Sequence, residues 1–487
     1  MRLTVKSLLI LLMFSFAAWQ STSHANNRIK LPDIGSSSGI IISTQIEKKL
    51  GKLFIRSIRR SIPLIEDPEI NEYIQTLGNR VAKASEQPDR YFNFFGVDDR
   101  RINAFAGPDA NIGINAGLIM ATETESELAS VFAHEVGHVT QHHLQRSIEA
   151  TSQMSLPNAA ATLAAVVLGM AVPGVGPAAV IAVQAASVQK QINFTRAHEA
   201  EADRVGIQTL ADAGLDPRSM PIFFGRLQAS TRNMKQKIPE ILRTHPAPIS
   251  RISDTAARAE KFPFKQVSDS QDFRLIKMKV RIAIKLQTTQ NLIITLRNEA
   301  QRGIDEQKAA AEYGLALLYT DNQQFQDAKK ILSQLTKKFP FQKQYLTAFA
   351  LNEHAAGHEK KASALFDLAA KRFPHSRAVN LLYAQFLLQI DKPNLAITLL
   401  DKDLKNFPAT PRVYDQLAIA HGKIKSPVRG FQYKAEYFYS IGKTRAAIVQ
   451  LEQALLAAND NFYFSSQVEN RINYFQNELR EEKKGPL

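Results

Sequence analysis

The pattern of hydrophobic and polar positions divides the chain into three regions. Residues from about 40 to 265 mix helical segments with a short strand-like stretch. Residues 266–305 are mostly helix-forming, and from about residue 306 onward the sequence repeats itself. The pattern therefore predicts a mainly α-helical chain with a small β-sheet in a domain over 26–265, a helical connection over 266–305 and a separate repeat domain over 306–487.

The C-terminal repeat has a fixed period. Phe-Pro pairs recur every 34 residues, beginning at Phe339, Phe373 and Phe407. Alanines keep the same interval, at Ala328, Ala362 and Ala396. A small residue lets two helices pack closely and a proline ends each helical pair, so the period indicates an α-solenoid of tetratricopeptide repeats. A displaced repeat follows around Ala435 and Gly442. Such arrays present a groove to protein ligands, which we favour over a role as packing scaffold alone.

The N-terminus has the pattern of a secretory signal. Two basic residues precede an apolar run from Leu8 to Trp19, and Ser23-His24-Ala25 offers small residues for cleavage. We expect a signal peptide over 1–25, a mature start near Asn26 and a periplasmic location. The alternative is an uncleaved membrane anchor, but the run falls short of the ~20 residues that span a bilayer.

A second apolar stretch runs from Leu156 to Gln189. It contains no charged residue, and Pro173-Gly174-Val175-Gly176-Pro177 divides it into two halves. Each half is too short for a transmembrane helix, so the stretch predicts a helical hairpin. Such a hairpin is part of the core, a lid over an active site, or a wedge that touches membrane or apolar substrate.

Composition removes several kinds of chemistry. The 487 residues include no cysteine, which excludes disulfides, thiolate metal sites and cysteine nucleophiles. The formal net charge of +15 is spread along the chain without a long run of like charges. This diffuse basicity does not favour nucleic acid as a partner.

The motif His134-Glu135-Val136-Gly137-His138 carries the candidate chemistry. On a helix, His134 and His138 project from the same face one turn apart, close enough for both to bind one Zn²⁺. Glu135 lies beside the first of them, where a general base can address a water molecule on the metal. Thr122 or Thr124 is the expected N-cap of this helix.

Four other histidines are set aside as ligands. His142 continues the four-residue spacing but lies too far along the axis to share the ion, and His143 should point elsewhere. Both are interpreted as solvated residues or as residues that support a ligand. His354 and His358 also have ligand spacing, but no base lies between them, and we expect surface residues at a repeat turn.

A catalytic zinc site needs a third protein ligand, and an acidic helical segment after Arg196 can supply it. Glu199 and Asp203 are four residues apart and share a helix face, while Glu201 is turned away. The prediction is that Glu199 binds the metal and that Asp203 accepts the free ring N–H of a histidine ligand. The alternative is an exposed acidic helix.

These two motifs, 65 residues apart, resemble zinc metallopeptidases related to the CAAX prenyl protease and HtpX. The resemblance extends to Asn103-Ala104-Phe105-Ala106, to Gly113–Leu118 and to Thr244-His245-Pro246. It implies a zincin-like domain with one Zn²⁺, held by His134, His138 and Glu199. It also implies that Glu135 is the catalytic residue and that Asp203 belongs to the catalytic site as the partner of a ligand. It also implies that Gly113–Leu118 is an edge strand that pairs with extended substrates.

With a signal peptide before it and repeats behind it, such a peptidase resembles periplasmic members of the family. That resemblance implies an endopeptidase and chaperone that acts on misfolded or stalled outer-membrane proteins and on the β-barrel assembly machinery through the repeats. No stable transmembrane anchor is expected after cleavage. The rival hypothesis is a repeat scaffold or chaperone whose metal site is largely inactive.

His245 is the last candidate residue. The following proline holds it in an extended, loop-like segment, and the family resemblance places this loop beside the zinc. Two roles are open besides that of a plain surface residue: hydrogen-bond donor to the oxyanion, or reversible fourth zinc ligand. We favour the fourth ligand, because an apolar lid would fit a site whose activity is restrained.

Overall fold

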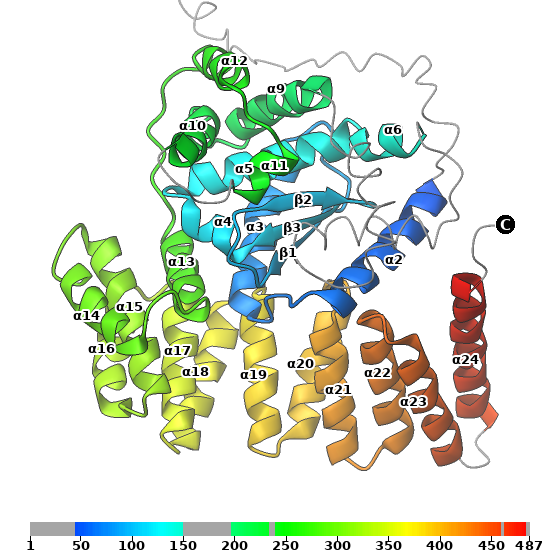
Figure 1. Cartoon of the computed structure of the whole chain (residues 1–487). Helices are drawn as coiled ribbons and strands as arrows, with labels where there is room; N and C mark the ends of the chain where they lie inside the picture. The colour runs from blue at the N-terminus through cyan, green and yellow to red at the C-terminus, as the bar shows by residue number, and fades with distance from the viewer. Residues whose placement is uncertain (1–43, 150–195, 233–238, 459–461, 484–487) are drawn as a thin grey trace, which may run out of the picture. The chain divides into compact units, whose positions relative to one another are not determined.

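The computed structural model describes residues 44–149, 196–232, 239–458 and 462–483 (Figure 1). The expected signal peptide and the apolar stretch 156–189 lie outside these residues. Within the described ranges, no helix combines the length and the apolar character needed to cross a membrane. The predicted fold class, mainly helical with one small sheet, is confirmed.

Residues 44–259 form what we call the sheet region. With the labels of Figure 1, its elements are α2 (Thr44–Ser61), α3 (Pro68–Lys83), β1 (Asn93–Val97), β2 (Ala104–Gly107), β3 (Asn111–Asn115), α4 (Ala116–Ala121), α5 (Glu125–Thr140), α6 (His143–Glu149), α9 (Arg196–Asp212), α10 (Ser219–Arg232), α11 (Glu240–Thr244) and α12 (Ile249–Ala259).

The sheet has three strands in the order β1-β3-β2. β3 pairs in parallel with β1 and antiparallel with β2, with Ala104 opposite Ile114. The expectation of an edge strand at Gly113–Leu118 is therefore wrong: Gly113 lies in the central strand, and the segment ends in α4. Every residue of β3 is buried, which explains its poor alternation. β2 is the edge strand that packs beside α5.

Helices cover both faces of this sheet. Phe94 points to the main core, which it shares with α3 and α5, whereas the next residue, Phe95, points to the opposite face and packs against α2. In the main core the Phe94 ring stacks on Phe132 of α5 at 5.4 Å between centroids. The helix that carries the candidate motif is thus fixed directly on the sheet.

Helix α13 (Gln271–Ala283) joins the two parts of the chain. Phe273 and Ile276 belong to the main core of the sheet region, whereas Leu275 and Met278 belong to the first core of the repeats. The expected domain boundaries remain a prediction, but this helix contributes to both cores.

The remaining helices form paired repeats, which we call the repeat region. They are α14 (Thr289–Glu299), α15 (Asp305–Asp321), α16 (Phe325–Lys338), α17 (Lys343–Ala355), α18 (Glu359–Arg372), α19 (Arg377–Gln389), α20 (Pro393–Asn406), α21 (Pro411–Lys423), α22 (Pro427–Ser440), α23 (Thr444–Ala457) and α24 (Phe462–Lys483). The periodic alanines are fully buried, at Ala328, Ala362 and Ala396. The periodic phenylalanines directly follow the second helix of a pair, at Phe339, Phe373 and Phe407.

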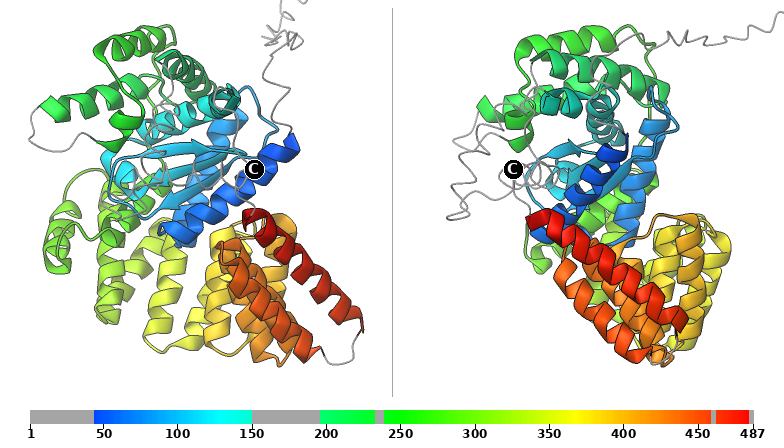
Figure 2. Two further views of the ribbon diagram at one scale, coloured as in Figure 1. Left: turned by 45° about the vertical axis from the view of Figure 1, so that its right-hand side comes forward. Right: turned by 90° about the vertical axis from the view of Figure 1, so that its right-hand side faces the viewer.

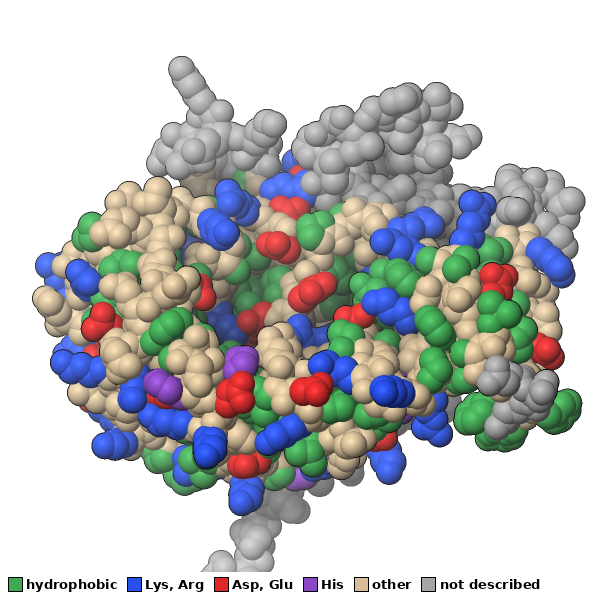
Figure 3. All heavy atoms as spheres, turned by 90° about the horizontal axis from the view of Figure 1, so that it is seen from below, with side chains coloured by type: hydrophobic (Ala, Val, Ile, Leu, Met, Phe, Trp, Pro, Cys, Tyr) green, Lys and Arg blue, Asp and Glu red, His purple; other side chains and the backbone are tan. Residues whose placement is uncertain are grey.

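The repeat region lies along α2 and α3 of the sheet region, as both views of Figure 2 show. At α3, Lys279 Nζ bonds to Glu69 Oε2 at 2.6 Å, and Thr347 Oγ1 donates to Glu69 Oε1 at 2.5 Å. At α2, the buried Arg56 pairs with Glu478 of α24 at 2.8 Å. The face seen in Figure 3, on the side of the repeats, intersperses basic side chains with acidic ones rather than gathering them in one patch.

Candidate metal centre

Helix α5 carries the first two candidate ligands. Its N-cap is Thr124, whose side chain accepts from the Glu127 backbone N–H at 3.1 Å. His134 and His138 follow one turn apart, and their Nε2 atoms lie 3.0 Å from each other. Both rings are buried, and both Nε2 atoms face the same point, as the sequence spacing predicts.

Helix α9 brings Glu199 to that point. Its carboxylate oxygens lie 3.5 Å from His134 Nε2 and 3.4 Å from His138 Nε2. Two glycines allow this approach, because a Cβ on Gly137 of α5 would lie 2.9 Å from the carbonyl oxygen of Ala202. A Cβ on Gly206 of α9 would likewise lie 3.1 Å from the carbonyl oxygen of Ala133. The backbones of α5 and α9 therefore meet closely where the candidate ligands lie.

His245 completes a group of four. It directly follows α11, and its Nδ1 lies 3.2 Å from His134 Nε2 and 3.1 Å from Glu199 Oε1. One ligand atom from each of His134, His138, Glu199 and His245 falls within 4.8 Å of the others, and all four side chains are buried. Two imidazoles and a carboxylate, with a third imidazole beside them, form a donor set that suits Zn²⁺.

Glu135 lies next to this group with an unusual environment. It is fully buried, and neither carboxylate oxygen has a hydrogen-bond partner among the described residues. Nε2 of His245 lies 3.6 Å from Oε1 of the Glu135 carboxylate. Burial raises the pKa of Glu135, and the neighbouring His245 and His134 offset this only in part. A buried, unpaired carboxylate with a raised pKa suits a group that exchanges a proton.

Asp203 and Arg251 contact the candidate ligands from the side away from the proposed ion. His134 Nδ1 contacts Asp203 Oδ1 at 2.9 Å, and Arg251 bonds to both Asp203 and Glu199, each at 2.8 Å. Asp203 therefore has the partner that the sequence predicts. Arg251 was not anticipated, because an arginine on an amphipathic helix carries no ligand spacing; its only signal is its position five residues after Pro246.

These contacts shift the pKa values of the group in different directions. Burial lowers the pKa of His134, but its hydrogen bonds to Asp203 and Glu199 prevail and raise it to about 9. The pKa of His138 lies well below its ordinary value because of burial. Burial opposes ionisation of Glu199, yet His245 and His138 hold its pKa well below the usual range. Since a metal requires neutral rings, binding of a cation must release the proton from His134.

The family model described as "Peptidase family M48" matches residues 68–259, which contain this group. A putative beta-barrel assembly-enhancing protease of Vibrio cholerae is 39% identical over 326 residues, 67% of either chain. The beta-barrel assembly-enhancing protease of Escherichia coli (strain K12) is 33% identical over 431 residues, 88% of either chain. This chain belongs to the beta-barrel assembly-enhancing protease family. It is a metallopeptidase, and the resemblance described from its motifs is confirmed at the level of the family.

Two more distant similarities each cover less than half of this chain. The bovine mitochondrial metalloendopeptidase OMA1 is 28% identical over 159 residues, 31% of this chain and 29% of its own. A solved thermophilic TPR protein of Thermus thermophilus covers 41% of this chain and 98% of its own at 15% identity, with a TM-score of 0.26. The assignment of the repeats rests on their period and their helices.

The predictions for the other histidines of this family member are confirmed only in part. The expectation that His143 points elsewhere is wrong, because it is fully buried and its Nδ1 lies 2.8 Å from Nδ1 of His138. The expectation assumed an unbroken helix, but α5 ends at Thr140. His142 is exposed. His358 is exposed at the turn before α18, as predicted, whereas His354 is half-buried against Phe386.

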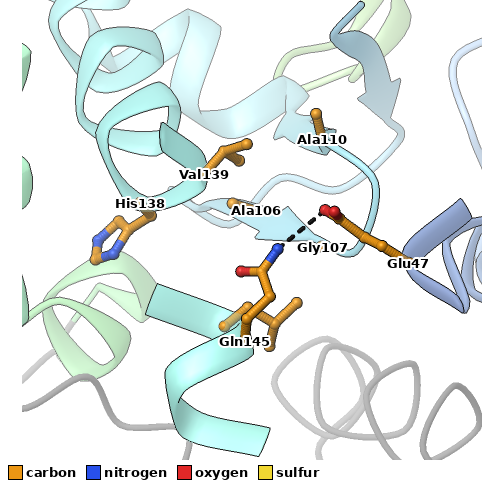
Figure 4. Close-up of a pocket in the computed structure, with 8 residues that line it drawn as sticks. Glu47, Ala106, Gly107, Ala110, His138, Val139 and Gln145 are labelled. Carbon is orange, nitrogen blue, oxygen red and sulfur yellow. Dashed lines mark hydrogen bonds between the residues drawn. The ribbon is translucent and has the colours of Figure 1, made fainter. Parts of the chain in front are cut away.

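A small pocket lies beside His138, between β2, α5 and α6 (Figure 4). Ala106 and Gly107 of the edge strand line one side, and the hydrogen bond from Gln145 to Glu47, at 3.0 Å, crosses it. In Figure 4 the His138 ring points away from this hydrogen bond. The edge strand of this metallopeptidase thus borders a hollow next to the candidate ligands.

Proposed function

We propose that this chain is a periplasmic zinc endopeptidase that acts on misfolded or stalled outer-membrane β-barrel proteins. The observation that carries the chemistry is the buried group of His134, His138 and Glu199 with the unbonded carboxylate of Glu135 beside it. The periplasmic location rests on the expected signal peptide. The role in assembly rests on the names of the relatives.

Each side chain has one task in this proposal. His134, His138 and Glu199 would hold the ion, and Asp203 and Arg251 would keep His134 and Glu199 oriented. A bound Zn²⁺ would polarise the scissile carbonyl and lower the pKa of a water molecule. Glu135 would accept the proton from that water and pass it to the leaving amine, a task that its raised pKa favours.

The substrate strand would pair with β2, the edge strand beside α5. Backbone pairing would align an extended segment without strong demands on its side chains, which suits a peptidase for unfolded chains. The small pocket between β2 and α6 borders this edge, and it would have to widen to admit a substrate strand. The hydrogen bond between Glu47 and Gln145 would have to open when a substrate enters.

His245 is the proposed reversible fourth ligand. Its Nδ1 lies 3.1 to 3.2 Å from Glu199 and from Nε2 of His134, a position that favours ligation over donation to an oxyanion. In that position its imidazole would occupy the place that a catalytic water needs. The resting enzyme would then be held inactive until the segment at α11 moves.

The repeat region would hold the partner or substrate. The residues that line a groove between α21, α22 and α23 include Ile419, Gly422, Gly430, Phe431 and Lys434. Ile419 is 46% exposed, although it is a large hydrophobic residue. A groove lined by apolar and basic side chains supports a protein ligand, in agreement with the expected role of the repeats.

The experiment that tests the peptidase is the variant Glu135→Gln. It should keep zinc, because Glu135 is not among the proposed ligands, and should lose proteolysis of a misfolded outer-membrane protein by a factor of about 10²–10⁴. Metal content by mass spectrometry separates this loss from loss of the ion. Undiminished proteolysis by the zinc-loaded variant would contradict the proposal.

The scaffold hypothesis is the second candidate, and the groove of the repeat region is the observation that favours it. It predicts that cells carrying Glu135→Gln assemble outer-membrane proteins as well as wild-type cells do. The peptidase hypothesis predicts an assembly defect. A chaperone function through the repeats alone would be supported only by the first result.

A further inference from the structure

The turn between α5 and α6 brings a further histidine to the ring of His138. His142 has a φ of 54°, in the left-handed region, so the α5 helix does not continue past it. In an unbroken helix, His143 would point ~140° away from His138. Instead the His143 ring is fully buried, and its Nδ1 lies 2.8 Å from Nδ1 of His138.

The roles of donor and acceptor in this pair follow from the other nitrogen of His138. Nε2 of His138 lies 3.0 Å from Nε2 of His134 and 3.4 Å from Glu199, so it faces the proposed metal site. A neutral ring that offers Nε2 to a metal carries its proton on Nδ1. Nδ1 of His138 therefore donates, Nδ1 of His143 accepts, and the proton of His143 is on its Nε2.

Nε2 of His143 has an acceptor of its own. It lies 3.0 Å from Oε2 of Glu201, and the Arg146 guanidinium donates to the same oxygen at 3.2 Å. The His198 ring stacks on His143 with the centroids 4.4 Å apart and the planes 18° apart. These contacts restrict the His143 ring and leave each of its nitrogens with a defined partner.

The two histidines of the motif are thus supported in different ways. His134 bonds directly to a carboxylate, that of Asp203, at 2.9 Å. His138 is linked to the carboxylate of Glu201 through the intervening imidazole of His143. We propose that His143 is a positioning residue that fixes the ring orientation and the tautomer of His138, with Glu201 as the terminal acceptor. This inference rests on the proposed metal site.

The test is the affinity of the metal-free full chain for Zn²⁺, measured by competition with a chromophoric chelator. His143→Leu removes the acceptor and keeps an apolar side chain in the buried position, and it should weaken zinc binding ~10–100-fold. His143→Asn places an amide oxygen near the position of Nδ1 and should restore most of the affinity. His142→Asn is the matched control: it removes the neighbouring imidazole, tolerates the left-handed backbone and should bind like wild type.

Two results would overturn the inference. One is wild-type affinity in His143→Leu, and the other is an equally large loss in His143→Leu and His143→Asn. Thermal unfolding of the metal-free forms checks that each variant folds. If His143→Leu does not fold, His143→Gln replaces it, since its oxygen does not fall at the Nδ1 position; it must then bind more weakly than His143→Asn. A wild-type chain that takes up no Zn²⁺ would instead overturn the proposed function, and this inference with it.

Discussion

The two candidate functional sites of this chain differ in their exposure to solvent. The metal centre of the sheet region is closed: His134, Glu135, His138, Glu199 and His245 are each at most 3% exposed. In contrast, the groove at α21–α23 of the repeat region is lined in part by Ile419, a large apolar residue that is 46% exposed. Under the proposed function, this difference corresponds to two tasks: the repeats would bind a partner, and His245 would restrain the buried centre.

The largest effect is expected from metal removal. Treatment of the full chain with a chelator should abolish proteolysis, and added Zn²⁺ should restore it. The reason is that the proposed mechanism depends on the metal ion to activate the attacking water. The helical signal of the repeat region should persist in circular dichroism, since no group of metal-ligating residues is found there within the described ranges. Proteolysis that survives complete chelation would show that the closed centre is not a metal site.

The second-largest effect is expected at His245, the proposed reversible fourth ligand. His245→Ala should raise basal cleavage of casein several-fold, because the proposed blocking imidazole is gone while His134, His138 and Glu199 remain. Binding of a partner to the repeat groove should not change. A drop of about 10²–10³ with zinc retained would instead assign His245 to the oxyanion, and unchanged turnover would contradict both roles.

A pair of glycine substitutions compares packing in the two regions. Gly137→Ala forces a Cβ to 2.9 Å from the Ala202 carbonyl oxygen, so it should cost about 1–3 kcal/mol of stability and weaken zinc binding by separating α5 from α9. Gly422→Ala is the matched control, because nothing lies within 4 Å of its Cβ and it should stabilise α21 by up to about 1 kcal/mol. Urea unfolding of both variants measures the difference. Equal effects would contradict the close approach of α5 and α9.

The smallest effect is expected at the contact between the regions, as a function of pH. Burial opposes ionisation of Asp67, but Lys279 and the cap hydrogen bonds prevail and hold the Asp67 pKa below its ordinary value of 3.8. A depressed pKa means that the stabilisation is complete above that value and is lost as the pH falls through the folded-state pKa. Unfolding between pH 6 and pH 3 should therefore show a loss of stability below about pH 4.

Lys279→Met removes the cation that Asp67 shares with the buried Glu69. In Lys279→Met the Asp67 pKa should rise, and the acid loss of stability should become shallower. The exposed pair of Lys338 with Asp305 on the repeat surface is the control, and Lys338→Met should leave the curve nearly unchanged because solvent screens that pair. An identical acid profile for wild type and Lys279→Met would contradict the role of this contact.

The two regions also differ in how far the sequence predicts them. The repeats could be predicted from their period, because each helix pair packs mainly on its neighbours and a buried alanine recurs every 34 residues. His134, Glu135, His138 and Glu199 were predictable from spacing on single helices. The position of β3 was not, since a strand buried on both faces loses its alternation.

The contacts that spacing could not predict are those of Arg251 and His143. Arg251 reaches Asp203 and Glu199 from a different helix, and nothing in its local pattern indicates a buried ion pair. The contact of His143 with His138 depends on one left-handed residue, His142, at the end of α5. Histidine has no strong preference for that conformation, so the turn could not be predicted from the sequence.

The most direct test of the central claim is anomalous X-ray diffraction at the zinc edge from crystals of the full chain grown with Zn²⁺. The account predicts one strong peak within bonding distance, ~2.0–2.2 Å, of His134 Nε2, His138 Nε2 and a Glu199 carboxylate oxygen. A chain that folds and crystallises with zinc but shows no peak there, or shows its peak at other residues, would contradict the account.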